Sequence, residues 1–200
     1  MIDKIKWLGH ASIQIKSDKV IYIDPWKLRG TEEEADIILI THDHYDHCVP
    51  EDVAKIQGEK TVVVTTADCA QKLSGDVRII APGQSITVEG VQVEAVPAYN
   101  LNKDFHPQAN GWVGFIVTIG GRRIYHAGDT DFTPEMGQIQ ADIVLLPVGG
   151  TYTMTADEAA KAANAIGPSH AVPMHYGTIV GSEKDARRFQ ELCRVPVTIL

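Results

Sequence analysis

The sequence predicts one α/β domain in which β-strands outnumber helices, and three observations support this prediction. Short segments rich in β-branched residues dominate the first hundred positions, whereas helix-start signals are few. Several strand-like segments separate one helix signal from the next, which differs from the strict strand–helix alternation of a doubly wound fold. No linker, repeat or low-complexity tract divides the 200 residues, a length that suffices for one domain with a buried core.

The expected strands begin as a meander and continue into a run that is apolar without alternation. Ile2–Leu8, Ala11–Lys16 and Lys19–Asp24 are short and separated by turn residues. The run Ala35–Thr41, with the sequence ADIILIT, indicates a central strand buried on both faces. Gly120-Gly121 predicts a hairpin turn between two further strands. The remaining expected strands are Thr61–Val64, Val77–Ala81, Ser85–Val88, Val91–Val96, Val113–Ile119, Arg123–Ala127 and His170–Pro173.

Helices are expected where an N-terminal signal precedes a run of helix-forming residues. Thr155-x-x-Glu158 is a capping box, and Gly167-Pro168 ends the alanine-rich segment that follows it. Pro50 suits a first helical position, because its missing N–H has no helical partner there. Ser182-x-x-Asp185 is a second capping box, in which Asp replaces the usual Glu or Gln. The expected helices are Pro50–Gln57, a short segment from Thr65 to Leu73, Thr155–Ile166 and Ser182–Cys193.

Composition excludes several classes of protein. The net charge is −8, from 18 Lys and Arg against 26 Asp and Glu, so the basic surface of a nucleic-acid-binding protein is absent. No apolar run approaches the roughly 20 residues of a membrane-spanning helix, and the N-terminus lacks the layout of a secretion signal. The three cysteines share no close spacing, which suits a reducing compartment. We therefore expect a cytoplasmic protein without nucleic-acid partners.

A histidine-rich motif follows the strand predicted at Ala35–Thr41. His42, His44, Asp46 and His47 lie within six positions, and imidazole and carboxylate groups are ligands for Zn, Mn, Fe or Ni. Alternate spacing lets His42 and His44 point to one side, while Asp46 and His47 can face a second ion. The motif predicts a metal site, and a solvated histidine-rich loop is the weaker interpretation.

Further ligands must come from other segments, because four residues in one loop cannot complete two coordination spheres. Asp129 lies in the sequence HAGDT, just past the strand that follows the Gly-Gly turn. His175 lies in VPMHYG, past the strand at His170–Pro173. His106 lies in a loop before Trp112. Each of these residues alone could be structural, but together with the motif they form a plausible ligand set.

These motifs resemble the metallo-β-lactamase fold superfamily. THDHYDH, HAGDT and VPMHYG stand in that superfamily's order and spacing, and the resemblance extends from Trp7 to Tyr176. One branch of this superfamily has segments similar to WLGHASIQI and VIYIDPW at the start of the chain, and to HP and GWVGFIV before HAGDT. That branch holds L-ascorbate-6-phosphate lactonase-like and N-acyl-phosphatidylethanolamine phospholipase D-like hydrolases. The resemblance implies a four-layered αββα sandwich with metals at one edge, between the two sheets.

The resemblance also implies roles for the candidate residues. It assigns His42, His44 and His106 to one metal, Asp46, His47 and His175 to a second, and Asp129 to both. His106 departs from the Gly-His-Thr turn of many members, so His10 and His126 remain alternatives for the first metal. Asp24 resembles a carboxylate that supports a ligand histidine, although a turn-forming role for Asp24-Pro25 is equally compatible with the sequence.

The expected activity is hydrolysis by two divalent ions, most simply Zn, with Mn, Ni or Fe as alternatives. Such ions hold a bridging hydroxide, which attacks a small ester-like substrate, a phosphodiester or a lactone. Asp46 and Asp129 are the candidate catalytic residues, since either carboxylate can carry a proton to the leaving group. Two alternatives stay open: a mononuclear-iron redox enzyme similar to sulfur dioxygenases, and a non-catalytic metal-binding module. The expected partner is a small molecule, and assembly into a homo-oligomer is compatible with the sequence.

Overall fold

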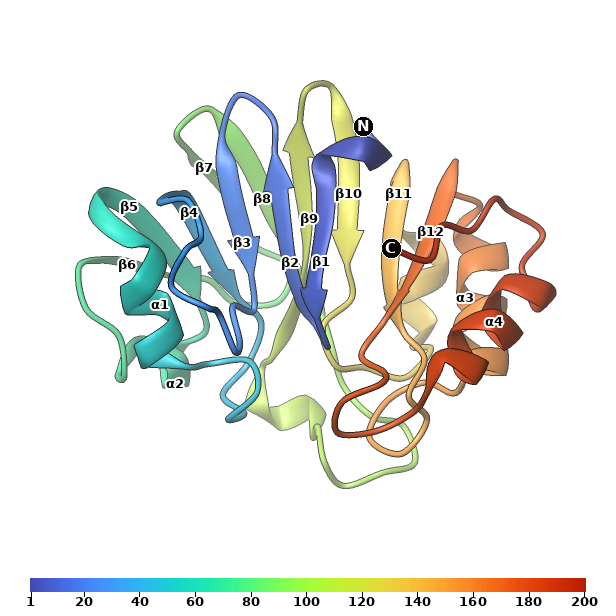
Figure 1. Cartoon of the computed structure of the whole chain (residues 1–200). Coiled ribbons are helices and arrows are strands. Elements are labelled where there is room, and N and C mark those ends of the chain that lie inside the picture. The colour runs from blue at the N-terminus through green and yellow to red at the C-terminus, as the bar shows by residue number, and fades with distance from the viewer.

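Two six-stranded mixed β-sheets pack face to face, and helices cover the outer face of each sheet (Figure 1). This arrangement is seen in a computed structural model that describes residues 1–200. Figure 1 shows helices α1 and α2 outside the first sheet and helices α3 and α4 outside the second. The predicted four-layered αββα sandwich is therefore confirmed.

The first sheet has the strand order β1-β2-β3-β4-β5-β6. Strands β1 to β3 are antiparallel neighbours, whereas β3 to β6 run parallel to one another. Its strands are β1 (Ile5–Gly9), β2 (Ser12–Lys16), β3 (Val20–Ile23), β4 (Ala35–Ile40), β5 (Gln57–Thr65) and β6 (Asp76–Ile79).

The second sheet has the order β12-β11-β10-β9-β8-β7. Strands β7 to β10 are antiparallel, and β10 to β12 are parallel. Its strands are β7 (Ser85–Val88), β8 (Val91–Pro97), β9 (Val113–Ile119), β10 (Arg122–His126), β11 (Ile143–Pro147) and β12 (His170–Met174). Strand β11 was not among the predicted strands, and it completes the parallel part of this sheet.

Four α-helices and three short 3-10 helices complete the fold. The α-helices are α1 (Pro50–Ile56), α2 (Ala67–Ala70), α3 (Ala156–Ile166) and α4 (Glu183–Leu192). The 3-10 helices are η1 (Ile2–Lys4), η2 (Gln108–Asn110) and η3 (Pro134–Gln138). The capping boxes predicted for α3 and α4 are both present. Helix α2 begins after Thr66 rather than Thr65 and is shorter than predicted.

Alternating side chains of the central strands fill two separate apolar clusters. In β4, Ile37 and Leu39 belong to the large cluster between the two sheets, whereas Ile38 and Ile40 belong to a smaller cluster beneath α1 and α2. Both faces of β4 are therefore buried, which explains why ADIILI is apolar without alternation. The sandwich holds the strand ends of both sheets in fixed positions.

Parallel strands bring their carboxyl ends to a common edge of each sheet. The loop after β4 carries the histidine-rich motif, and the segments after β10 and β12 carry Asp129 and His175. A hydrogen bond from the Val113 N–H to the Thr41 carbonyl, 3.1 Å long, ties the first of these loops to the second sheet.

No helix of the chain has the length and apolar character needed to cross a membrane.

Candidate metal centre

The loop after β4 turns tightly, so that its four motif side chains converge. The N–H groups of His47 and Cys48 both donate to the carbonyl of His44, at 3.1 and 2.8 Å. His42, Asp46 and His47 are buried, and His44 is partly exposed. Nε2 of His42 lies 3.0 Å from Nδ1 of His44, so these two nitrogens face the same small volume.

Asp129 lies at the centre of the candidate ligand set. Its Oδ1 is 3.4 Å from Nε2 of His47, and its Oδ2 is 3.3 Å from Nε2 of His106 and 3.0 Å from Nε2 of His175. Gly128 positions this carboxylate, because its φ of +63° is a conformation that side chains rarely adopt. A Cβ at Gly128 would also lie 2.9 Å from the carbonyl oxygen of Val113.

The structure brings all seven predicted ligands together in overlapping groups. Within each group, the ligand atoms lie within 4.8 Å of one another. The groups are His42, His44 and His106; His10, Asp46, His47 and His175; and His42, His47 and Asp129. The first two groups match the predicted division between two metals, except that His10 joins the second, and the third group links them.

The chemistry of the buried donor atoms fits divalent metal ions. Nε2 of His47, His106 and His175 and Oδ1 of Asp129 are buried and have no hydrogen-bond partner. Buried polar atoms almost always have partners, so four such atoms directed at one volume require an explanation. Imidazole nitrogen and carboxylate oxygen are ligands for Zn, Mn, Ni and Fe, and a bound ion would satisfy each of these atoms.

Three neighbours direct the histidine lone pairs towards this volume. Asp24 accepts from Nδ1 of His47 at 2.8 Å and, through both carboxylate oxygens, from the N–H and hydroxyl of Thr41. Because the Thr41 hydroxyl donates to Asp24, it accepts from Nδ1 of His42, at 2.9 Å. Both histidines therefore donate from Nδ1, and Nε2 is the nitrogen of each ring that faces the candidate metal volume. Asp24 supports the site as the resemblance implied, and its φ of +47° also places it in the turn before Pro25.

Asn100 performs the same task for His106. Its Nδ2 donates to Asp131 and to the carbonyl of Tyr152, so its Oδ1 accepts from Nδ1 of His106 at 3.0 Å. The backbone N–H of His106 donates to the same oxygen. Sequence reasoning missed Asn100 and Asp131, because no motif marks these residues. Thr41 begins the motif THDHYDH, but the sequence did not indicate its contact with His42.

Burial and neighbouring charges shift the pKa values of the central groups. Burial alone would raise the pKa of Asp129, but His175 and His47 hold it well below its usual range. Burial alone would lower the pKa of His47, but the carboxylates of Asp129 and Asp24 raise it well above its usual range. Burial lowers the pKa of His42, which keeps it neutral as a ligand must be. Because His175 and His47 hold the pKa of Asp129 low, its carboxylate is ionised at neutral pH.

His10 and His126 occupy different environments. His10 donates from Nε2 to Asp46 at 2.9 Å, and its ring lies 3.8 Å from that of His175. Both ring nitrogens of His126 are engaged: Nε2 donates to the carbonyl of Ala11 at 2.8 Å, and Nδ1 accepts from the N–H of Gly128 at 3.2 Å. His126 is thus a structural residue, whereas His106 shares a group with His42 and His44.

Cys48 follows His47 but packs on the other side of the loop. It is buried with Cys69 in the apolar cluster beneath α1 and α2. A hydrogen bond with Cys69, together with burial, raises the pKa of the Cys48 thiol, which therefore stays protonated. Cys48 is therefore a buried structural thiol.

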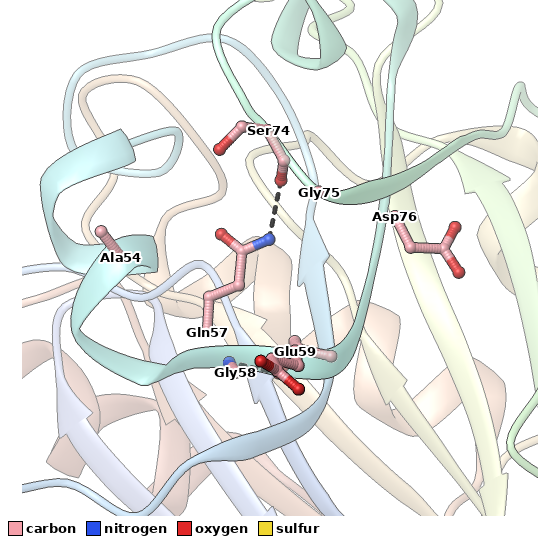
Figure 2. A pocket seen from close by; sticks show the side chains of 8 residues that line it. Ala54, Gln57, Gly58, Glu59, Ser74, Gly75 and Asp76 are labelled. Atoms are coloured by element: carbon pink, nitrogen blue, oxygen red, sulfur yellow. Dashed lines mark hydrogen bonds between the residues drawn. The ribbon is translucent and has the colours of Figure 1, made fainter.

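A cavity of about 200 Å³ opens onto the candidate ligands. Its lining residues are His44, Tyr45, Asp46, Phe105, His106, Asp129, Tyr152, His175 and Ile179. Figure 2 shows a different cavity, where Gln57 donates to the carbonyl of Ser74 at 2.7 Å. That cavity lies where the parallel strands β5 and β6 begin, whereas the candidate ligands of the first sheet follow the carboxyl end of β4. No histidine lines it. The cavity beside Asp129 is therefore the candidate active site.

Sequence comparisons show which known proteins the chain resembles. The model of the beta-lactamase superfamily domain matches residues 4–175. A UPF0173 metal-dependent hydrolase of Thermoplasma acidophilum is 37% identical over 204 residues, which cover 94% of this chain and 90% of that protein. Another, from Thermococcus kodakarensis, is 36% identical over 204 residues, which cover 94% and 91% of the two chains.

Solved structures agree with these matches. The crystal structure of a Parabacteroides distasonis protein, assigned as a metal-dependent hydrolase, superposes with a TM-score of 0.88 at 33% identity, covering 98% of this chain and 91% of that one. The metallo hydrolase Igni18 of Ignicoccus hospitalis, at 24% identity and a TM-score of 0.78, covers 98% and 94% and shows the same fold.

The fold and these matches define an enzyme of the metallo-β-lactamase fold, a metal-dependent hydrolase. The chain belongs to the UPF0173 family within the beta-lactamase superfamily.

Proposed function

We propose that this hydrolase uses two divalent metal ions to cleave a small ester-like substrate, a phosphodiester or a lactone. The observation that carries the proposal is the position of Asp129. One carboxylate oxygen lies 3.4 Å from His47, and the other lies 3.3 and 3.0 Å from His106 and His175. A single carboxylate between two groups of donors suits a ligand shared by two ions.

The proposed ligand set follows the geometric groups. His42, His44 and His106 would hold one ion, and Asp46, His47 and His175 would hold the other. Asp129 lies beside residues of both groups and would be the ligand that the two ions share. His10 is a positioning residue in this scheme, since its hydrogen bond of 2.9 Å holds Asp46. Zinc is the proposed metal because nitrogen and oxygen ligands suit it, and Mn, Ni and Fe suit the same donors.

The chemistry divides between the ions and the residues around them. Two ions held here would supply an attacking hydroxide at neutral pH, since such sites lower the pKa of water from about 15.7 to about 7. Asp46 and Asp129 both line the cavity, so either carboxylate can carry a proton to the leaving oxygen. Asp129 is itself buried, which limits the bulk water around its carboxylate.

Hydrolysis assays with matched variants test this proposal. We expect the metal-loaded enzyme to cleave bis(p-nitrophenyl) phosphate or γ-butyrolactone, and Asp129→Asn to lower kcat/KM at least about 100-fold, the usual scale for losing a group that stabilises the transition state. Asp18→Asn is the matched control, because Asp18 is exposed in the turn between β2 and β3 and does not line the cavity.

Two results would contradict the dinuclear hydrolase. One is full activity in the Asp129→Asn variant. The other is oxygen consumption with a persulfide substrate by a protein that holds a single iron, which would identify the mononuclear redox alternative. Absence of metal binding after loading with each ion in turn would show that the proposed ligand set is wrong.

A further inference from the structure

The mouth of the candidate active site gathers exposed apolar side chains. Six large hydrophobic residues of the chain are exposed, and three of them, Tyr45, Phe105 and Ile179, line this cavity. Their exposed fractions are 72%, 47% and 37%. Contiguous apolar surface is costly to leave in water and marks a binding site when it surrounds a cavity.

Four separate loops build this apolar rim. Tyr45 comes from the loop after β4, Phe105 from the loop after β8, Tyr152 from the loop after β11 and Ile179 from the loop after β12. The rings of Phe105 and Tyr152 pack edge to face, with centroids 4.7 Å apart. Because each loop also positions polar groups of the site, the rim and the candidate ligands belong to one cavity. We call these four residues the apolar rim.

The cavity has no cationic side chain that could bind an anionic group. No lysine or arginine is among its lining residues, and Lys103, in the same loop as Phe105, is paired with Asp131 at 2.6 Å. A second phosphate or carboxylate on the substrate would therefore meet apolar side chains and lose its hydration without a partner. An uncharged alkyl or aryl group would bury the rim at no such cost.

We propose that the substrate carries an uncharged alkyl or aryl substituent, which packs against the apolar rim, and no anionic group beyond the one that reacts. This inference rests on the proposed function, because it takes the ligand set as the reacting end of the cavity. Hydrolysis adds water across the ester bond: the hydroxyl joins the acyl carbon or phosphorus, and the proton joins the leaving oxygen. The apolar rim acts on specificity and takes no part in these bond changes.

Matched substrate pairs test the inference with the metal-loaded enzyme. The lactone pair is γ-butyrolactone and γ-decanolactone, which differ by a hexyl group. The phosphodiester pair is methyl p-nitrophenyl phosphate and bis(p-nitrophenyl) phosphate, which share a leaving group. In whichever pair is cleaved, we expect kcat/KM to be at least tenfold higher for the larger member, since each fully buried methylene strengthens binding about fourfold. A γ-lactone that bears a carboxylate should be cleaved more slowly than γ-butyrolactone.

One variant of the rim avoids the residues that position the candidate ligands. Ile179→Ser should reduce the preference for the larger substrate several-fold through KM, with kcat for γ-butyrolactone or methyl p-nitrophenyl phosphate nearly unchanged. Ile79→Ser is the matched control, because Ile79 is also exposed but lines a different cavity. Metal content and thermal unfolding confirm that each variant is folded and loaded.

A binding measurement gives a readout that does not need activity. Calorimetric titration compares 2-pyrrolidinone with 5-hexyl-2-pyrrolidinone, two lactams that resist hydrolysis. We expect the hexyl lactam to bind at least tenfold more tightly, and Ile179→Ser to remove most of that gain.

The possible outcomes separate the two proposals. Cleavage with equal kcat/KM for both members of a pair would overturn the proposal that the substrate carries an apolar substituent. It would not contradict the proposed hydrolase function. Binding of the hexyl lactam without cleavage of any probe would overturn the proposed function and support the apolar site. Failure of both lactams to bind would overturn this inference. An oligomer that Ile179→Ser dissociates, measured by light scattering, would identify the rim as a protein interface instead.

Discussion

At the scale of single residues, the candidate site depends on neighbours that direct histidine lone pairs. Thr41, Asp24 and Asn100 each engage one ring nitrogen of a candidate ligand, so the other nitrogen is free. Such neighbours carry a substantial share of metal affinity, because they fix the orientation of the ring and its tautomer.

Replacement of Asn100 tests this role. Asn100→Ala should weaken metal binding about 10- to 100-fold, because Nδ1 of His106 loses its only acceptor. Asn100→Asp keeps an acceptor oxygen and should restore most of the affinity. Competition with a metallochromic chelator measures the affinity, and Asn102→Ala, on the same loop, is the control. Equal affinity in Asn100→Ala and the wild type would show that Asn100 does not position His106.

Replacement of His126 separates a structural histidine from the candidate ligands. His126→Ala should lower the free energy of unfolding by about 1–3 kcal/mol, because the carbonyl of Ala11 and the N–H of Gly128 lose a buried partner. Metal per chain should stay unchanged, whereas His106→Ala should lower it. Chemical denaturation and elemental analysis measure the two effects. Loss of a metal equivalent in His126→Ala would place His126 among the ligands.

At the scale of elements, local patterns predicted most of the fold. The capping boxes located both outer helices of the second sheet, since a cap depends on residues three positions apart. The strand Ile143–Pro147 was missed although its apolar run resembles that of β4, because a short apolar run fits several structures. Helix α2 shifted by one residue, since either Thr65 or Thr66 could precede it and the pairing of Thr65 with Ile79 keeps Thr65 in β5.

The cap of α3 gives a prediction at this scale. Thr155→Ala should lower the free energy of unfolding by about 1 kcal/mol, because the N–H of Glu158 loses its side-chain acceptor. Denaturant unfolding measures the change, with Thr31→Ala, at an exposed loop position, as the control. If both variants are as stable as the wild type, the capping interaction does not contribute to stability.

At the scale of the whole molecule, the candidate site joins the two sheets. His42, His44, Asp46 and His47 come from the first sheet, whereas Asp129 and His175 come from the second, and His106 lies on a loop between β8 and β9 of the second. Sequence motifs pointed to these residues, because imidazole and carboxylate groups are common metal ligands and four of them stand within six positions in the motif after β4. The contacts of Asn100 and the apolar rim could not be predicted from the sequence, since only the folded loops bring those residues together.

Removal of metal should therefore loosen the whole sandwich. An ion that binds only the folded chain stabilises it by about 4 kcal/mol at a free concentration 1,000 times its Kd. We expect a chelator to lower Tm by several degrees and re-addition of metal to restore it, as measured by calorimetry. An unchanged Tm after complete removal of a bound metal would show that the ions do not link the two sheets.

The central claim is that one carboxylate, Asp129, serves two ions. Elemental analysis of untagged protein, wild type and Asp129→Ala, tests it most directly. We predict about two equivalents of Zn, Mn or Ni in the wild type and at most one in the variant, because Asp129 contacts donors of both groups. A single equivalent in the wild type that Asp129→Ala leaves unchanged would contradict the account.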